Sequence, residues 1–347
     1  MSRLLDKPPF APRDDAGFLA EMNLLSRFHL DGCLEYRRIW PDWSPATDIA
    51  GLPFLHVGLF KRLLLRTTSD TVQHRRTLTS SATTGSSPSQ IVLDQKSSVL
   101  QAQSSLAILR EMVGPEMRPL IVLDDARSLH RRSVTARVAA AMSLKPLASE
   151  IHFVLDESVQ PPVVRWDAVR EILLHHNDLL VYGFTSILWQ SWTSGQFPAE
   201  VRGLLAGKRI HFVHSGGWKK LESLSVTRET FDSRLLEGLS DGSHVVDYYG
   251  LVEQVGIIYP LCEHGYRHVP RWAGIVVRDP WTMEPLANTE GLLQSMNVLA
   301  YGAPYHNVLT EDLGRLVPGE CSCGRAGRRF ELLGRAPQVE VRGCANV

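Results

Sequence analysis

Residues 77–94 read TLTSSATTGSSPSQIVLD, where a hydroxyl-rich stretch runs directly into an apolar one. Thirteen consecutive positions (77–89) hold nine Ser or Thr residues with one Gly and one Pro. This composition is typical of a solvated linker. It is also typical of a phosphate-binding loop, because a Gly among small hydroxyl residues lets successive backbone N–H groups converge on phosphate oxygens. Composition alone leaves both interpretations open.

The segments beyond this stretch alternate between strand and helix patterns. Short apolar runs bounded by polar or Gly residues are typical of buried parallel strands, and helical patterns lie between them. We therefore expect a mostly parallel sheet with helices on both faces. The predicted strands are PLIVLD (119–124), IHFVLD (151–156), DLLVYG (178–183) and KRIHFVH (208–214), and the predicted helices are 97–113, 128–144 and 166–176.

The pattern changes near Tyr248. After this point, short strand patterns are separated by Gly, Pro and Asn, which predicts a β-rich subdomain. We divide the chain accordingly into an α/β region (1–247) and a β-rich region (248–347). The strand patterns of the second region are QVGIIYP (254–260), AGIVVRD (273–279), GLLQSMN (291–297), RRFELLG (328–334) and QVEVRG (338–343).

Composition and charge exclude several classes of protein. The 347 residues are 44% hydrophobic and 21% charged, as in compact globular proteins. Lys plus Arg and Asp plus Glu both number 37, so no net field attracts nucleic acid or an anionic membrane. The N-terminus lacks a secretory signal, and no run of roughly 18 apolar residues predicts a membrane span. We expect a cytoplasmic location.

The five cysteines are an odd number and do not indicate a disulfide framework. Cys262 precedes His268 by six positions, and Cys321 and Cys323 flank a single Ser. Thiolates and an imidazole in such a set suit tetrahedral structural zinc, with His264 as an alternative to His268. The alternative is a group of buried thiols.

Five segments, in order, resemble motifs of the adenylate-forming enzymes. The stretch 79–89 is similar to their phosphate-binding loop, and HSGGWKK (214–220) resembles a segment of the LuxE-type acyl-protein synthetases in the phenylacetate-CoA-ligase-like branch. The other three are DYYGLVEQVG (247–256), LTEDLG (309–314) and LLGRAPQVEVRGC (332–344), and the approach GLFKRLLLRTTSD (58–70) is also similar. The resemblance implies the large α/β domain of that superfamily, and some members of the branch carry similar Cys and His elements around zinc.

The resemblance also implies a site for ATP and Mg²⁺. Glu253 would help to hold Mg²⁺, unless it is an ordinary surface residue. Tyr249 and Gly250 would flank the adenine, although a strand Tyr often belongs to a core. Asp312 would accept hydrogen bonds from the ribose hydroxyls, and Arg335 would contact the same nucleotide. Phosphate donors would come from Thr79, Ser80, Ser81, Thr83, Thr84 and Gly85, with Thr84 among the catalytic residues, and further nucleotide contacts from Gly216 and Gly217.

Some positions depart from the family pattern. Ala82 and Ser89 stand where the phosphate-binding loop commonly has Gly and Lys. The small C-terminal domain of most adenylate-forming enzymes is expected to be absent. In acyl-protein synthetases, a Cys after an Arg-Gly pair carries the acyl group as a thioester, and Cys344 matches this position. A neighbouring guanidinium could lower the pKa of that thiol. The alternative is a thiol with no role.

The resemblance implies an ATP-dependent ligase that forms an acyl-adenylate from a fatty or aryl carboxylic acid and transfers the acyl group to Cys344 or to a carrier, reductase or acyltransferase protein. The segment GFTSILWQSW (183–192) lies where related proteins build the acyl pocket, although a core helix would look the same. Two other functions stay open: a ligase acting on CoA or an amine, and a non-catalytic nucleotide-binding scaffold.

Overall fold

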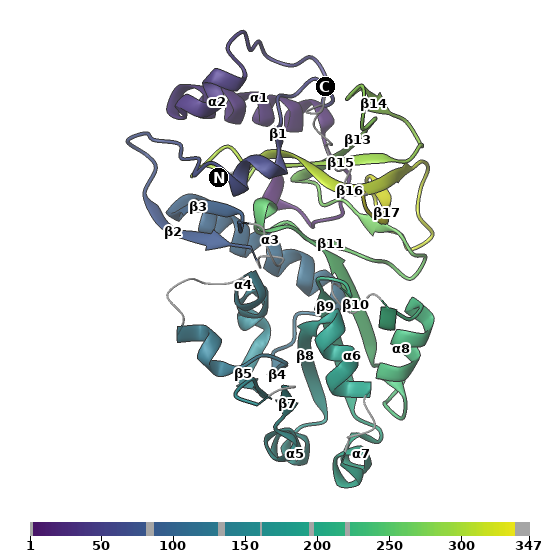
Figure 1. Ribbon diagram of the computed structural model, residues 1–347. Helices are drawn as coiled ribbons and strands as arrows, with labels where there is room; N and C mark the ends of the chain where they lie inside the picture. The colour runs from purple at the N-terminus through teal and green to yellow at the C-terminus, as the bar shows by residue number, and fades with distance from the viewer. Residues whose placement is uncertain are drawn as a thin grey trace, which may run out of the picture.

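The computed structural model describes residues 3–80, 87–130, 136–159, 162–193, 198–218 and 223–336. Two large sheets form the molecule, one largely parallel and one largely antiparallel, and helix α3 lies between them (Figure 1). The predicted α/β fold with a mostly parallel sheet and a β-rich part is confirmed. The division at residue 247 stays a prediction, and strand β10 (His244–Tyr249) crosses it.

The parallel sheet has six strands in the order β11-β10-β9-β8-β4-β5. All neighbours are parallel except the β10–β11 pair, which is antiparallel. The strand positions follow the predicted apolar runs closely. The bounds of the remaining strands are β4 (Arg118–Val122), β5 (Ala148–Phe153), β8 (Asp178–Phe184), β9 (Arg209–Ser215) and β11 (Tyr259–Pro260).

Helices cover both faces of this sheet, as the alternating pattern predicts. Apolar side chains of α3 and α4 pack with Val213 and Tyr248 on one face. Those of α5 to α8 pack with Ile210 and Phe212 on the other, because successive strand residues point to opposite faces. The helix bounds are α3 (Gln95–Val113), α4 (Ala136–Ser143), α5 (Trp166–His175), α6 (Thr185–Thr193), α7 (Ala199–Leu205) and α8 (Arg228–Leu236).

The second sheet has the strand path β12-β17-β16-β15-β13-β14, with β1 added beside β16. Its pairs are antiparallel except for β1–β16. Phe18 and Met22 of α1 (Asp15–Gly32) pack into its core. The strands are β1 (Leu55–His56), β12 (Arg267–His268), β13 (Ala273–Arg278), β14 (Pro285–Leu286), β15 (Gly291–Asn297), β16 (Asn307–Val317) and β17 (Arg329–Arg335).

Helix α3 connects the two sheets. Its first turn is capped by Asp94, whose carboxylate accepts hydrogen bonds from the backbone of Lys96 and Ser97, and it ends at Gly114. Leu100 and Ile108 belong to the core of the antiparallel sheet, whereas Leu109 and Val113 belong to that of the parallel sheet. Opposite faces of this one helix are therefore buried against different sheets.

The hydroxyl-rich stretch is the connection of a hairpin, β2 (His74–Thr79) and β3 (Gln90–Asp94). Leu78 and Leu93 of this hairpin share a core with the helices α2 (Leu34–Ile39) and η2 (Val57–Lys61) and with Val308 of β16. This core holds the base of the connection beside the strand that carries Asp312.

Two predicted elements are described only in part or differ in the structure. The pattern 128–144 gives η3 (Ala126–His130) and α4, while 131–135 lie outside the described residues. The pattern 254–260 forms a strand only at β11, because Gly256 adopts a φ of 81° against α3, where a Cβ would lie 2.5 Å from Gln101 Cα. The other elements are η1 (Arg3–Asp6), η4 (Lys145–Leu147), η6 (Val252–Gln254), β6 (Leu155–Asp156) and β7 (Val163–Val164).

The described helices include none that is both long enough and apolar enough to cross a membrane. Residues 338–343, predicted as a strand, and Cys344, predicted to accept the acyl group, lie outside the described part of the chain.

Candidate active site

A cavity of ≈ 1290 Å³ is lined by residues of both sheets and of α3, α4 and α6. It lies at the carboxyl ends of β9 and β10, where open parallel sheets bind ligands. Two parts of its lining differ in chemistry. The polar wall comprises Ser80, Ser87, Ser89, Tyr249, Glu253, Asp312 and Arg335. The helix wall comprises Ser98, Gln101, Ala102 and Ser105 of α3, Ala139, Ala140, Met142 and Ser143 of α4, and Thr185, Ser186, Ile187 and Gln190 of α6.

The two ends of the hydroxyl-rich connection meet at the polar wall. The backbone N–H of Ser80 donates to the carbonyl of Ser89 (3.1 Å), and the N–H of Ser89 donates to Ser80 Oγ (2.9 Å). This pair closes the base of the connection at the cavity. Thr79 ends β2 and is not among the residues that line the cavity. The predicted phosphate donors Ser81, Thr83, Thr84 and Gly85, and Ala82, lie outside the described residues.

Glu253 faces the same part of the cavity. It belongs to η6 and is only 5% exposed, so it is not an ordinary surface residue. Burial raises the pKa of its carboxyl group, while a hydrogen bond from Ser89 and the positive charge of Lys61 favour the ionised form. This carboxylate is thus held beside the base of the hydroxyl-rich connection.

Tyr249, Asp312 and Arg335 form a connected group on the polar wall. The phenol of Tyr249 donates to Asp312 Oδ2 (2.7 Å), and Arg335 Nε lies 3.8 Å from Asp312 Oδ1. Asp312 and Arg335 are register partners on β16 and β17, so the sheet itself places them together. Burial raises the pKa of Asp312, whereas the hydrogen bond from Tyr249 and the charge of Arg335 lower it. The carboxylate is therefore oriented and largely buried.

Gly216 and Gly217 follow β9 and also line the cavity. Their φ angles are 87° and 61°, in the region that favours glycine. A Cβ on Gly216 would lie 3.2 Å from the ring of Phe184. At this turn, where glycines leave the backbone uncovered, a flat ligand can approach the main chain closely. Gly250, which follows β10, also lines the cavity.

Helix α6, which holds most of the segment 183–192, contributes to the core on one face and to the cavity on another, and the acyl pocket stays a prediction. Leu188 and Trp192 are buried in the core of the parallel sheet. Ser186, Ile187 and Gln190 line the cavity instead. Residues of α3 and α4, most of them small, supply the rest of the helix wall, which is the part that the sequence did not identify. The recurrence of small residues at helical spacing (98, 102, 105) is the signal that could have indicated it.

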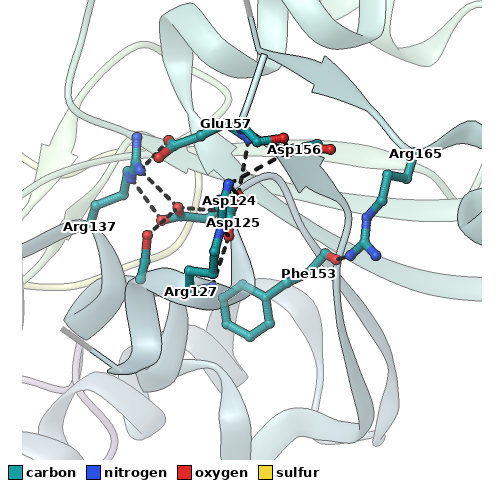
Figure 2. A network of polar contacts seen from close by, with 10 residues as sticks. Asp124, Asp125, Arg127, Arg137, Phe153, Asp156, Glu157 and Arg165 are labelled. Atoms are coloured by element: carbon teal, nitrogen blue, oxygen red, sulfur yellow. Dashed lines mark hydrogen bonds and ion pairs between the residues drawn. The ribbon is translucent and has the colours of Figure 1, made fainter.

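Helix α4 is held in place by a network of ion pairs (Figure 2). Arg137 Nε lies 2.7 Å from Asp124 Oδ2, and Arg137 Nη2 donates to Asp124 Oδ1 (2.8 Å) and Glu157 Oε1 (2.6 Å). Asp124 follows β4 and is 1% exposed. Asp125 accepts the backbone N–H of Glu157 (3.0 Å), which joins the loops after β4 and β6. The network thereby fixes one side of the helix wall.

Cys262, His268, Cys321 and Cys323 form a second cluster, with candidate ligand atoms within 4.8 Å of one another. The sulfurs of Cys262 and Cys321 are 3.9 Å apart, far beyond a disulfide bond, and Cys323 Sγ lies 3.2 Å from His268 Nε2. Tetrahedral ligands at Zn–S distances of about 2.3 Å would be separated by about 3.8 Å, so the donor set fits zinc. The exposed His264 is not in the group.

Matching turns present the cysteines of this cluster. Gly265 N–H donates to the carbonyl of Cys262 and Gly324 N–H to that of Cys321, both at 3.0 Å, and both glycines have positive φ angles. Burial and two nearby arginines lower the pKa of His268 to about 4, which keeps the imidazole neutral as a ligand must be. His268 lies on β12, beside β17, so the cluster braces the strand that ends in Arg335.

The profile of the family described as "Acyl-protein synthetase, LuxE" matches residues 4–347. The chain belongs to this family. Two curated relatives share 28% identity over 142 residues: the long-chain-fatty-acid–luciferin-component ligases of Vibrio harveyi and Aliivibrio fischeri. That alignment covers 40% of this acyl-protein synthetase family member and 36% and 37% of the two relatives. The chain therefore matches little more than a third of each relative.

Solved structures confirm the adenylate-forming ligase fold for this family member. 2-Hydroxyisobutyryl-CoA ligase, in an open conformation with 2-HIB-AMP and CoA, superposes with a TM-score of 0.69 over 92% of this chain and 69% of its own. The same ligase in the postadenylation state with 2-HIB-AMP superposes with a TM-score of 0.67, over 92% of this chain and 67% of its own. Both are 14% identical, so they establish the fold alone.

Proposed function

We propose that the protein is an ATP-dependent acyl-activating ligase that forms an acyl-adenylate and transfers its acyl group to a thiol. The main observation in support is that one cavity is lined by the two ends of the hydroxyl-rich connection, by Glu253 and by Asp312. These parts are far apart in the sequence. Family membership supports the same reaction class. In this reaction a carboxylate oxygen attacks the α-phosphorus of ATP, the bond to the bridging oxygen breaks, and pyrophosphate leaves.

Each part of the polar wall has a role in this proposal. Asp312 accepts hydrogen bonds from the ribose hydroxyls, and Tyr249 keeps the carboxylate in position through its 2.7 Å bond. Glu253 is the ligand for Mg²⁺, which supplies electrostatic stabilisation of the phosphates when bound. The adenine lies between Tyr249 and the turn at Gly216 and Gly217, with Gly250 allowing close approach. Arg335 contacts the same nucleotide, and the hydroxyl-rich connection binds the phosphates.

The substrate is proposed to be a fatty acid, with an aryl acid as the alternative. The helix wall combines small side chains with the apolar side chains of Met142 and Ile187, which leaves room for a narrow chain between α3, α4 and α6. The two curated relatives are named as ligases for long-chain fatty acids, which agrees with this choice. Acyl transfer is proposed to Cys344 and onward to a partner protein such as a reductase.

Exchange of labelled pyrophosphate into ATP, measured with carboxylic acids of increasing chain length, tests the activation step. Acid-dependent exchange is expected, with a preference for long chains. Intact mass after incubation with ATP and the preferred acid tests the acceptor. An adduct present in wild type and in Cys33→Ala, but absent in Cys344→Ala, is expected. An adduct that survives Cys344→Ala would contradict transfer to that thiol, and exchange without any protein adduct in wild type would favour transfer to CoA or an amine. No exchange with any acid would favour a nucleotide-binding scaffold.

We also propose that Cys262, His268, Cys321 and Cys323 bind a structural Zn²⁺. The fit of the sulfur distances and the neutral imidazole support this assignment. Elemental analysis of the purified protein should find one zinc per chain, and Cys321→Ser should lose it together with thermal stability. Cys33→Ala, which removes a thiol elsewhere in the core, should keep the metal. One zinc per chain retained in Cys321→Ser would contradict the ligand set.

A further inference from the structure

Two cationic side chains of the cavity lining, Lys61 and Arg76, differ from the others in how they are paired with carboxylates. Within the described residues, the cationic side chains of its lining are Lys61, Arg76, Arg228, Arg267 and Arg335. A triphosphate carries several negative charges that a bound divalent ion offsets only in part. Any cation in the lining that is not already paired is therefore available to the phosphates.

Three of these cations are paired with carboxylates of the same lining. Arg267 lies 2.7 Å from Asp247, and Arg228 lies 3.3 Å from Asp232. Arg335 lies 3.6 Å from Glu311 and 3.8 Å from Asp312. The charges of Arg267 and Arg228 are compensated on the protein. Arg335 is held at longer distances and is already assigned to the nucleotide in the proposed function.

Lys61 is held loosely at the polar wall. Its Nζ lies 3.9 Å from Glu311, and it makes no hydrogen bond to any other part of the chain that the structure describes. Its side chain is 31% exposed, and its charge acts on Glu253, which accepts a hydrogen bond from Ser89. The ammonium group is thus close to the base of the hydroxyl-rich connection. Val57 and Phe60, which precede it in η2, are buried beside Leu78 of the hairpin and fix this placement.

Arg76 approaches the same connection from the hairpin. It lies on β2, opposite Leu93, four positions before Ser80. The described residues place no carboxylate at ion-pair distance from its guanidinium, whereas its neighbour Arg75 is hydrogen-bonded to Gln95. Adjacent strand residues point to opposite faces, which explains why only Arg76 lines the cavity.

We propose that Lys61 and Arg76 are catalytic residues that contact the phosphates of ATP during adenylation. This inference rests on the proposed function. As the carboxylate oxygen bonds to the α-phosphorus, the bridging oxygen leaves with the electron pair, and negative charge accumulates on pyrophosphate. No proton is transferred in this step. An ammonium and a guanidinium beside the phosphates stabilise that charge more strongly than they stabilise bound ATP.

The chain supplies a matched control for each residue. Arg62 and Arg75 carry the same charge as Lys61 and Arg76 and are their neighbours in sequence, but neither lines the cavity. The four alanine variants can be compared in pyrophosphate exchange and in binding of Mg·ATP and of AMP. AMP lacks the β- and γ-phosphates, so its binding reports on folding and on the adenosine site.

Lys61→Ala and Arg76→Ala should each lower the exchange rate about 100-fold, as loss of one preorganised donor at a transition state does. They should weaken Mg·ATP binding while AMP binding stays within about twofold, and Lys61→Arg should recover part of the rate. Arg62→Ala and Arg75→Ala should match wild type. Equal exchange in all four variants would overturn the proposal while leaving the proposed function intact. Wild type that neither binds ATP nor exchanges pyrophosphate would overturn both.

Discussion

On the polar wall, Tyr249, Asp312 and Arg335 come from different strands yet are joined by specific polar contacts. The described residues of the helix wall include no linked group of ionisable side chains, and most of them are small or uncharged residues on three helices. On the polar wall, the charge and hydrogen-bonding groups of a side chain should therefore decide which residues are tolerated. On the helix wall, the volume of the side chain should decide it. Substitutions on the polar wall should abolish a step, and those on the helix wall should change which acid is accepted.

Asp312→Asn should produce the largest effect. The amide keeps the shape and can still accept the hydrogen bond of Tyr249, but it loses the charge that strengthens hydrogen bonds to both ribose hydroxyls. Hydrogen bonds to charged groups contribute about 1.5–3 kcal/mol, so we expect the KM for ATP in pyrophosphate exchange to rise about 100-fold. Glu331→Gln, which disrupts a surface ion pair with Arg315 on the same two strands, should leave it unchanged. A similar KM for ATP in Asp312→Asn and wild type would contradict the proposed role of Asp312 in binding the ribose.

This contrast also explains which features could be predicted. The parallel strands and the β-strand at 291–297 follow directly from apolar runs and turn residues. Glu253 and Asp312 lie in segments that resemble family motifs, and the structure places both in one cavity, while their roles stay a prediction. The Cys/His group could be predicted from residue types that suit a metal, and its four members lie together. Lys61 lies in the segment 58–70 that resembles the family, but no role could be assigned to it from the sequence. Its place beside Glu253 depends on how η2 packs against the hairpin.

The ion pairs of Arg137 are expected to give the next largest effect. In Arg137→Met, the buried Asp124 loses its main partner, and the free energy of unfolding should fall by about 3 kcal/mol in denaturant titrations. Removing the buried charge as well, in Arg137→Met/Asp124→Asn, should recover part of this loss. Arg170→Met, which disrupts exposed ion pairs with Glu171 and Glu200, should cost less than about 1 kcal/mol. If both single Arg variants lose equal stability, the network does not anchor α4.

Ala140→Leu tests the helix wall with a smaller expected effect. Ala140 lines the cavity from α4, and a larger side chain there takes up space without adding charge. We expect exchange with long-chain acids to fall about 10-fold while short acids react as before. The added side chain would occupy the space of a few methylene groups, so a long acyl chain would lose those contacts with the pocket. The same change at the exposed Ala199, at the start of α7, should leave the profile unchanged. Equal losses for acids of all lengths would mean that Ala140 does not face the acyl chain.

The pH dependence of the polar wall should give the smallest effect. Burial raises the pKa values of Glu253 and Asp312, and both carboxyls must be ionised to act in the proposed reaction. Exchange should therefore begin to fall, on acidification, above the ordinary carboxyl range of about 4. Stability should change in the opposite direction, because groups with raised pKa values bind protons more tightly in the folded than in the unfolded state, so they favour folding as the pH falls. A pH profile of exchange, compared with thermal unfolding of wild type and Glu253→Gln over the same range, separates the two effects. In Glu253→Gln, the melting temperature should rise less on acidification than it does in wild type. An equal rise in both proteins would show that another group titrates in this range.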